Sequence, residues 1–320
     1  PAAALLVIHR HAVKFAGFLK SWLEAAKVDG RVHSVFTNSV VVSGRQSSRD
    51  PNMQQIALPW RYAFIPSDGR IMGAADYAQL EVRIAAFVSR DPALMAIVTE
   101  PPDTPQGDIH GQNVTKLFAV SYENQHLPTF DKAFRVRAKN YLFGALYGSR
   151  GLEVQTVLEQ KFLEMELEGA VPTVREIARG IDALRGAYSI YFHEYIPYTL
   201  QKARENDCTF WTAFGRPRRI PELLSGYKEE REAAERSGIS HTVQGTAADI
   251  ARMASNGIGR IDHGALLTVN HDEFVFEVDT DYEEWYGARV VAIMELGQPL
   301  EGVPLFVDVG WGPNWAECHK

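Results

Sequence analysis

Residues 266–278 read LLTVNHDEFVFEV, and this stretch decides the predicted fold. Apolar residues lie on both sides of a polar centre that runs from Asn270 to Glu273. This pattern is typical of two strands joined as a hairpin, although the centre lacks the Asn-Gly type of turn. The tight part of the predicted hairpin therefore carries two neighbouring carboxylates, Asp272 and Glu273.

A third acidic residue, Asp76, follows an apolar run elsewhere in the chain. Residues 70–75 lead into Asp76, and apolar residues at helical spacing follow from Leu80 to Val88. The pattern predicts a strand that runs into a helix. A single Asp at such a junction is often only a helix cap, so Asp76 by itself does not indicate a function.

Carboxylates that are brought together repel one another, and they normally need cations to remain ionised. Hard oxygen ligands with few His or Cys neighbours favour Mg²⁺ over Zn²⁺. Two such metals would serve an in-line phosphoryl displacement. The spacing alone does not establish that Asp76 and Asp272 meet.

The remaining pattern predicts mostly helices. The predicted segments are an amphipathic helix over 2–27, strands and loops over 31–69, a loop over 101–106, mainly helix over 110–203 with a break near 147–151, a loop over 214–221, and helix over 227–258.

The segment from Lys132 to Arg150 carries five cations and no acidic residue. Four of its residues are spaced so that a helix would align them in one stripe of two cations and two aromatic rings, a stripe made of Arg135, Lys139, Phe143 and Tyr147. Cations for phosphate and a ring for stacking are what a nucleotide needs. The alternative is a solvated basic face whose aromatic rings pack into the core.

Length, composition and charge limit what kind of protein the chain can be. The chain has 320 residues, 46% of them hydrophobic, and a net charge of −7. Its length suits one large or two modest domains. Because the chain is acidic, any contact with nucleic acid must rest on local basic patches, such as 43–48 and 215–219.

Two cysteines cannot form a disulfide framework and suggest a reducing, intracellular compartment. No apolar stretch approaches the roughly 18 residues of a membrane span. The chain begins at Pro1, and targeting signals are therefore not judged.

Several motifs occur in a fixed order along the chain. They are SGRQSSRDPN at 43–52, DYAQLEVR at 76–83, GDIH at 107–110, RVRAKNYLFGALYG at 135–148, FGR at 214–216, VQGTAAD at 243–249 and HDE at 271–273. With these motifs the sequence resembles family A DNA polymerases, the group of bacterial DNA polymerase I and its phage relatives, over essentially all 320 residues.

The resemblance implies an α+β, right-hand polymerase fold, with an antiparallel palm sheet, helical fingers and only the base of the thumb. The implied parts are a thumb-base helix at 1–27, the palm at 28–83 and 241–320, and the fingers at 84–240. The rest of the thumb, and the proofreading exonuclease domain of many relatives, would precede Pro1.

The resemblance also implies roles for single residues. Two Mg²⁺ ions, which Mn²⁺ could replace, would be held by Asp76, Asp272 and the backbone carbonyl of Tyr77, with Glu273 as an auxiliary carboxylate. The residues implied around the incoming dNTP are Arg135 and Lys139 on the triphosphate, with Lys139 as candidate proton donor, Gln79 and His110 near the phosphates, Phe143 on the nucleotide, Tyr147 at the templating position, and Glu81 against the sugar 2′ position. The residues implied at the primer and template are Arg45, Asn52, Arg83, Gln244 and His271.

Some positions depart from the family's usual residues. Ala78 and Val82 are small apolar-compatible changes in the first catalytic motif. Asn270 stands where an apolar residue is usual and could alter the hairpin. Ser240 and Thr242 stand ahead of the Gln244 motif, where the family commonly has Asn and Pro, so this segment departs from the pattern that implies primer contacts.

The resemblance predicts a template-directed DNA polymerase that adds dNTPs to a primer 3′-hydroxyl and releases pyrophosphate, in replication or repair. Expected partners are primer-template DNA, dNTPs and a separate thumb and exonuclease region or a processivity factor, with no membrane involved. The expected location is the cytoplasm or nucleoid, or an infected host cell. Alternatives are a non-catalytic primer-template-binding remnant, a metal-dependent nuclease, and an RNA polymerase or reverse transcriptase.

Overall fold

The computed structural model describes the whole chain except residues 1–12, 14–15, 39, 150, 297–299 and 320. The chain forms two compact units, which we call the sheet unit and the helical unit. The sheet unit comprises Pro1–Ala78, Ala247–Gly297 and Val307–Lys320, and the helical unit comprises Gln79–Thr246 and Gln298–Phe306.

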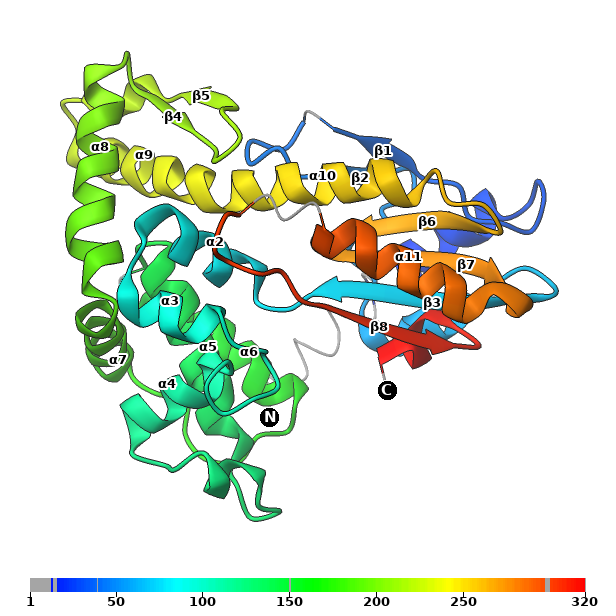
Figure 1. Ribbon diagram of the computed structural model, residues 1–320, viewed down its shortest axis with the longest axis horizontal. Coiled ribbons are helices and arrows are strands. Elements are labelled where there is room, and N and C mark those ends of the chain that lie inside the picture. Colours follow the sequence, from blue (N-terminus) through cyan, green and yellow to red (C-terminus); the bar gives the residue numbers. More distant parts are fainter. Residues whose placement is uncertain (1–12, 14–15, 39, 150, 297–299, 320) are drawn as a thin grey trace. The chain divides into compact units, whose positions relative to one another are not determined.

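The sheet unit is built on a four-stranded antiparallel sheet in the order β6-β7-β3-β8 (Figure 1). The strands are β6 (Gly264–Asn270), β7 (Glu273–Asp279), β3 (Arg70–Tyr77) and β8 (Val307–Gly312). The hairpin predicted at residues 266–278 is therefore confirmed as β6 and β7. The α+β fold is confirmed as well, because the chain combines this antiparallel sheet with a predominantly helical unit.

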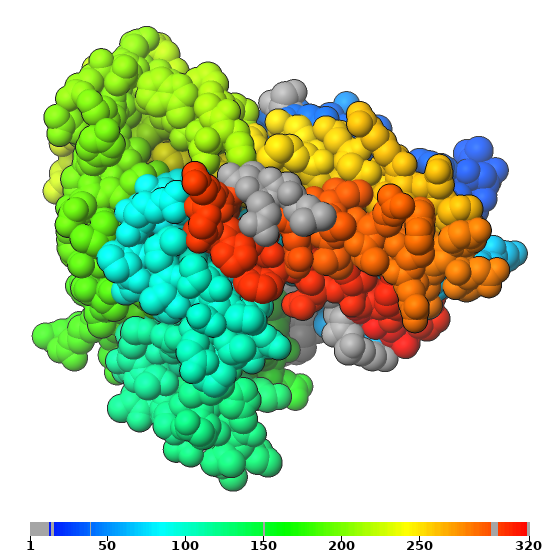
Figure 2. Space-filling view, viewed as in Figure 1, coloured from blue at the N-terminus to red at the C-terminus, as the bar shows by residue number. Residues whose placement is uncertain are grey.

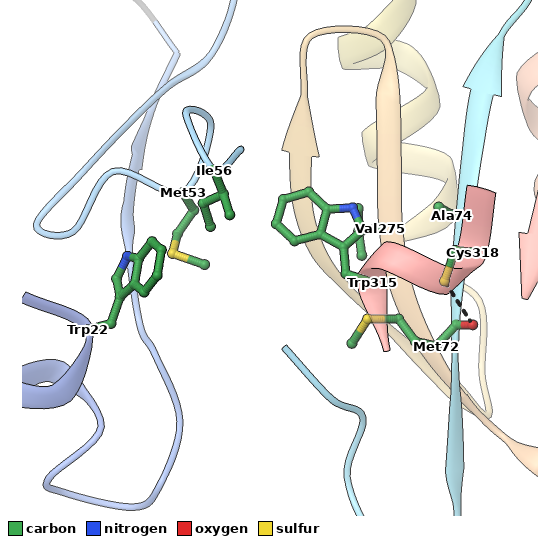
Figure 3. Packing of buried hydrophobic residues seen from close by; sticks show 8 residues of the cluster. All are labelled: Trp22, Met53, Ile56, Met72, Ala74, Val275, Trp315 and Cys318. Atoms are coloured by element: carbon green, nitrogen blue, oxygen red, sulfur yellow. Dashed lines mark hydrogen bonds between the residues drawn. The ribbon is translucent and has the colours of Figure 1, made fainter. Parts of the chain in front are cut away.

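Residues on alternate sides of β3 contact different layers. Met72 and Ala74 pack with Trp315 and Cys318 in a buried cluster, where the Cys318 thiol donates a hydrogen bond to the Met72 carbonyl (Figure 3). Helix α11 (Glu283–Leu296) covers the other face, and its side chains appear as an orange surface in Figure 2. Buried layers on both faces hold β3 rigidly up to its acidic end.

The remaining elements complete the sheet unit. They are β1 (Val35–Thr37), β2 (Ser47–Arg49), η1 (Leu58–Ala63), η6 (Thr280–Tyr282), η7 (Trp315–His319) and α10 (Thr246–Ile258) from Ala247 onward. Residues 16–25 of the predicted N-terminal helix are helical, and most of its first half lies outside the described residues.

The helical unit confirms the mostly helical pattern predicted over 110–203, with a break at 147–151. Its elements are α2 (Leu80–Ser89), α3 (Pro92–Val98), α4 (Ile109–Phe118), η2 (Glu123–His126), α5 (Lys132–Leu146), α6 (Leu152–Glu164), α7 (Val174–Ala187), η3 (Tyr191–Tyr195), α8 (Ile196–Glu205), β4 (Thr209–Trp211), β5 (Pro217–Arg219), η4 (Pro221–Leu224), α9 (Lys228–Ser240) and η5 (His241–Gly245). Acidic N-caps begin three of the helices, because the carboxylates of Asp91, Asp108 and Asp131 accept hydrogen bonds from backbone N–H groups of the first turn.

The prediction of a plain loop at 214–221 is wrong. Residues 217–219 form β5, which pairs with β4 in a small hairpin. Two cations of the basic patch at 215–219 are engaged inside the helical unit: Arg218 donates hydrogen bonds to Ser237, and Arg219 pairs with Asp207. These partners hold the two side chains against the protein surface, which weakens the case for this patch as a polyanion contact.

The described residues contain no helix that is both long enough and apolar enough to span a bilayer.

Candidate active site

Acidic side chains line up at one end of the sheet. Asp76 on β3 lies directly opposite Glu273 on β7 and directly opposite Asp308 on β8. Residues that are opposite one another in an antiparallel pair project from the same face of a sheet. Three neighbouring strands therefore place their carboxylates in one row, and Asp272 stands beside this row in the hairpin turn.

The charges of this row act on one another. Partial burial, followed by the negative charges of Asp272 and Glu273, raises the pKa of Asp76 to about 7, and Asp308 adds to the shift. The structure thus brings Asp76 and Asp272 close enough to interact, which the sequence spacing could not establish.

Sequence reasoning missed Asp308. The short apolar run LFVDV at 305–309, which Asp308 interrupts, was a signal that an acidic residue sits on a strand there. Nothing in the sequence showed that this strand pairs with β3 in the register that faces Asp308 toward Asp76.

Glu273 is held differently from the other acidic residues. Its Oε1 accepts hydrogen bonds from Arg61 Nη1 at 3.0 Å and from Trp315 Nε1 at 2.8 Å. The Arg61 guanidinium also lies 4.3 Å from the centre of the Trp315 ring. Because a cation and an indole N–H already satisfy this oxygen, Glu273 is suited to hold the hairpin in place beside the other carboxylates.

The donor set of this row consists of hard oxygens, which fits Mg²⁺ or Mn²⁺. Among the described residues, no group of three or more His, Cys, Asp or Glu side chains forms a cage that could hold a metal ion. Mg²⁺ does not require such a cage, since it usually keeps several waters and binds through one or two carboxylates and substrate phosphates. The residues present therefore fit the metal that the resemblance implies.

Tyr77 anchors the end of β3. Its side chain is buried, and its hydroxyl donates a hydrogen bond to the Met294 carbonyl of α11 at 3.0 Å. Burial, followed by the charge of Glu295, raises the pKa of Tyr77, which keeps the phenol neutral. The backbone next to Asp76 is thus fixed from the opposite face of the sheet.

The structure brings together two of the predicted DNA-binding residues of the sheet unit. Arg45 and His271 line one small hollow, together with Arg252. Asn52 does not line this hollow; its side-chain oxygen accepts a hydrogen bond from the backbone N–H of Gln54 at 2.8 Å. Arg252 was not singled out by the sequence, because its role depends on how α10 packs against the segment that carries Arg45.

The predicted stripe of the helical unit lies on α5. The helix ends at Leu146, so Tyr147 is its C-cap residue. The rings of Phe143 and Tyr147 are stacked, with centroids 6.3 Å apart and planes 11° apart, and His110 lies 6.3 Å from Phe143. Lys139 is exposed. The two rings and the cation therefore follow the helix as the spacing predicted.

Arg135 has a buried partner. Asp108 accepts two hydrogen bonds from its guanidinium, at 2.6 and 3.0 Å, and also caps α4 by accepting from the N–H groups of His110 and Gly111. Burial alone would raise the pKa of Asp108, but the hydrogen bonds from Arg135 and Gly111 outweigh it and leave the pKa below its usual value. Asp108 therefore positions Arg135, a role that the sequence did not show.

His110 is neutral near pH 7. Burial, followed by the positive charges of Lys139 and Arg135, lowers the pKa of His110 to about 3. Its Nδ1 and the Oε1 of Gln79 are buried and have no hydrogen-bond partner among the described residues. Buried polar atoms are normally paired, so these two atoms are suited to a bound ligand.

Tyr147 connects two more predicted residues. Its hydroxyl donates a short hydrogen bond to the carboxylate of Glu81. Burial, followed by the charge of Glu81, raises the pKa of Tyr147 well above its usual value, while a hydrogen bond with Gln244 acts in the opposite direction. Ser240 in turn donates to Gln244 at 3.0 Å, so this departure from the family pattern keeps the Gln244 side chain oriented.

The structure contradicts the prediction that Arg83 contacts DNA. The residue is completely buried, and its Nη1 donates hydrogen bonds to the carbonyls of Val98 and Pro304. Its guanidinium lies 4.6 Å from the centre of the Phe306 ring. Arg83 therefore joins α2 to the segment before β8 within the helical unit, and its position in a polar motif did not reveal this burial.

Comparisons with known proteins identify the family of the chain. The model of the family described as DNA polymerase family A matches residues 1–317. The thermostable DNA polymerase I of Thermus thermophilus is 33% identical over 301 residues, which cover 91% of this chain and 33% of that protein. DNA polymerase I of Mycobacterium tuberculosis strain H37Rv is 31% identical over 327 residues, which cover 98% of this chain and 33% of that protein.

A solved structure shares the fold. The polymerase domain of Pol1 from M. smegmatis, in complex with a DNA primer-template and dNTP, matches with a TM-score of 0.82 and 27% identity, over 98% of this chain and 53% of that one. The chain spans about a third of the length of the curated relatives it matches. With a family match over nearly all of its residues, the chain belongs to the family A DNA polymerases.

Proposed function

We propose that the chain carries a template-directed DNA polymerase activity, which adds dNTPs to a primer 3′-hydroxyl and releases pyrophosphate. The observation that carries this proposal is the acidic row in which Asp76 lies opposite both Glu273 and Asp308, with Asp272 beside it. Such mutually repelling carboxylates are suited to holding divalent cations.

Asp76 and Asp272 would hold two Mg²⁺ ions, with help from the backbone carbonyl of Tyr77. Bound metal would favour deprotonation of the primer 3′-hydroxyl and offset the charge that develops on the transferred phosphoryl group. Glu273 would keep the turn in register through Arg61 and Trp315.

The residues on and around α5 would bind the incoming nucleotide. Arg135, oriented by Asp108, and the exposed Lys139 would contact the triphosphate, and Lys139 would donate a proton to the pyrophosphate leaving group. Neutral His110 would donate or accept a hydrogen bond without adding charge. The orphaned Oε1 of Gln79 would gain a partner in the same place.

The remaining aromatic and acidic groups would select the substrate. Phe143 would pack on the nucleotide, and Tyr147 would mark the templating position. Glu81, held by the Tyr147 hydroxyl, would crowd the sugar 2′ position and disfavour ribonucleotides. Arg45 and His271 are the strongest candidates for contacts with the primer-template, and Asn52 and Gln244 are further candidates.

The family implies further features that remain proposals for this chain. The thumb base would be 1–27, the palm 28–83 and 241–320, and the fingers 84–240. A separate thumb and exonuclease region or a processivity factor would supply additional grip on the duplex, since duplex affinity depends largely on phosphate neutralisation and this chain is acidic. Mn²⁺ could replace Mg²⁺.

Primer extension tests the proposal. We expect the chain, at low salt with Mg²⁺ and dNTPs, to extend a primer on a DNA template, and we expect Asp272→Ala to abolish extension while it leaves duplex binding mostly intact. Asp281→Ala, which removes an exposed carboxylate of η6, is the matched control and should retain full activity. A wild-type chain that binds the primer-template but does not extend it would instead support a non-catalytic remnant.

A further inference from the structure

Helices α4, α5 and α7 pack together in the helical unit (Figure 1). A hollow of about 430 Å³ opens between them. It is bounded by the end of α4, the middle of α5, the first half of α7 and the segment 170–172 before α7. Ligand pockets for small molecules have volumes of about 300–1,000 Å³, so the hollow has the size of a small-molecule site.

Three cations line this hollow, namely Lys116, Arg137 and Arg179. Glu176 is the acidic residue among its lining, and its carboxylate already accepts hydrogen bonds from the N–H and hydroxyl groups of Thr173 in the capping box of α7. The lining therefore has a net positive charge of two in a chain whose net charge is −7. This local excess favours an anionic ligand.

The guanidinium of Arg137 is held before any ligand arrives. Its Nη2 donates a hydrogen bond to the Ala170 carbonyl at 3.1 Å, and its centre lies 5.3 Å from the Phe162 ring. Its Nε is buried and has no partner among the described residues. A guanidinium that is fixed in place is well prepared to bind an oxyanion through its other N–H groups, because little side-chain entropy is lost.

Tyr141 offers a second donor. Its hydroxyl takes part in no hydrogen bond within the described part of the chain, although its ring is buried. The ring lies close against α7 at Gly180, where an added Cβ would come within 2.4 Å of it. Phe118, Leu117 and Val171 give the hollow an apolar wall.

This hollow is distinct from the proposed dNTP site. Successive residues of an α-helix are rotated by about 100°, so residues two positions apart project from nearly opposite sides. Arg137 and Tyr141 are each two positions from residues of the proposed dNTP site. They therefore project from a different face of α5 than Arg135, Lys139 and Phe143. A ligand in the hollow would therefore contact α5 on the face that is not part of the proposed dNTP site.

We propose that this hollow binds a small aromatic phosphate ester, an aryl or nucleoside monophosphate, with its phosphate held by Lys116, Arg137 and Arg179 and its ring against Phe118. The observations that carry the proposal are the three cations that line the hollow, the Arg137 guanidinium held in place by Ala170 and Phe162, and the apolar wall beside them.

Isothermal titration of the whole chain with phenyl phosphate, without DNA or dNTP, tests the proposal. We expect saturable binding that Lys116→Ala and Arg179→Ala each weaken by about tenfold or more, because each removes a charged contact with the phosphate. Both side chains are exposed, so neither change should unfold the protein. Arg175→Ala removes an exposed cation of the same helix that does not line the hollow, and it should leave the affinity within about twofold.

Further titrations, with other ligands and with another variant, identify the ligand and the place of binding. Adenosine monophosphate should bind at least as well as phenyl phosphate, whereas inorganic phosphate should bind about tenfold more weakly because it cannot use the apolar wall. Lys139→Ala should leave phenyl phosphate binding unchanged. The proposal is overturned if no saturable binding occurs up to about 10 mM, if inorganic phosphate binds as well as the esters, if Arg175→Ala matches the effect of Arg179→Ala, or if Lys139→Ala abolishes binding. None of these results depends on polymerase activity.

Discussion

Asp76 and Asp308 lie directly opposite one another on β3 and β8, and their carboxylates project from the same face of the sheet. The negative charge of Asp308 contributes to the raised pKa of Asp76. Asp308 therefore belongs electrostatically to the metal site that we propose, although no sequence motif contains it.

We expect Asp308→Asn to weaken Mn²⁺ binding by about fivefold, because a partly exposed carboxylate near a divalent cation contributes on the order of 1 kcal/mol. A Mn²⁺ titration measures this affinity, with the free ion monitored by electron paramagnetic resonance. Asp281→Asn removes one negative charge at a distant exposed position and is the control for net charge. Equal Mn²⁺ affinities of wild type and Asp308→Asn would exclude Asp308 from the site.

The pair of Asp108 and Arg135 allows capping and ion pairing to be separated. Asp108→Asn keeps a good N-cap residue for α4 but removes the charge that holds Arg135, whereas Asp108→Ala removes both. We expect the free energy of unfolding to fall by about 1–3 kcal/mol for Asp108→Asn and by about 1 kcal/mol more for Asp108→Ala, since Arg135 is partly solvated.

Urea unfolding measures both changes, and dNTP binding provides a second readout. If Arg135 acts only when Asp108 orients it, Asp108→Asn should weaken dNTP binding even under conditions in which the variant is fully folded. Unchanged dNTP affinity in this variant would show that the pair serves stability alone.

Arg83→Met tests the buried role assigned to Arg83. The substitution keeps most of the side-chain volume but leaves the carbonyls of Val98 and Pro304 without their donor, so we expect a loss of about 2–4 kcal/mol in the free energy of unfolding. Urea unfolding measures this loss. Fluorescence anisotropy with a labelled primer-template should show little change in duplex affinity for the folded variant, whereas Arg45→Ala should weaken it. The reverse order of the two affinities would restore Arg83 as a DNA contact.

The depressed pKa of His110 predicts a pH-dependent stability. The pKa of the imidazole is 6.5 when it is solvated, as in the unfolded chain, and about 3 in the folded chain, so between these values the unfolded chain binds a proton that the folded chain does not. The free energy of unfolding should therefore fall as the pH drops from about 6.5 toward 3, with a contribution from His110 of about 1–2 kcal/mol at about pH 5.

His110→Gln removes this group, so its free energy of unfolding should change less between pH 7 and pH 5 than that of the wild type. Urea unfolding at both pH values measures the difference. His126→Gln changes an exposed histidine in the same way and serves as the comparison. An identical pH dependence of wild type and His110→Gln would mean that His110 is solvated in the folded chain.

Local patterns predicted much of the fold. The hairpin at 266–278, the strand that ends at Asp76 and the helix that carries Arg135 to Phe143 are each specified by residue spacing over a few turns or pairs, because backbone geometry alone sets those periods. Strand β5, inside the predicted loop at 214–221, was missed, since it is only three residues long and its pairing with β4 supplies the stability that its own sequence lacks.

The sequence by itself determined the kinds of groups present: acidic residues at a strand end and in a hairpin turn, and a stripe of cations and rings along one helix. The order of motifs also determined the family. These features are local in the chain. They depend only on the residue types and on the helical and strand periods, and not on tertiary contacts.

Only the tertiary structure decided which groups meet and which are buried. The register of β3 with β7 and β8 places Asp76 between Glu273 and Asp308, and strand pairing over more than 190 positions of sequence separation follows from packing of the whole sheet. Burial likewise turned Arg83 from a predicted DNA contact into an internal donor, because exposure depends on the chain segments that cover a residue.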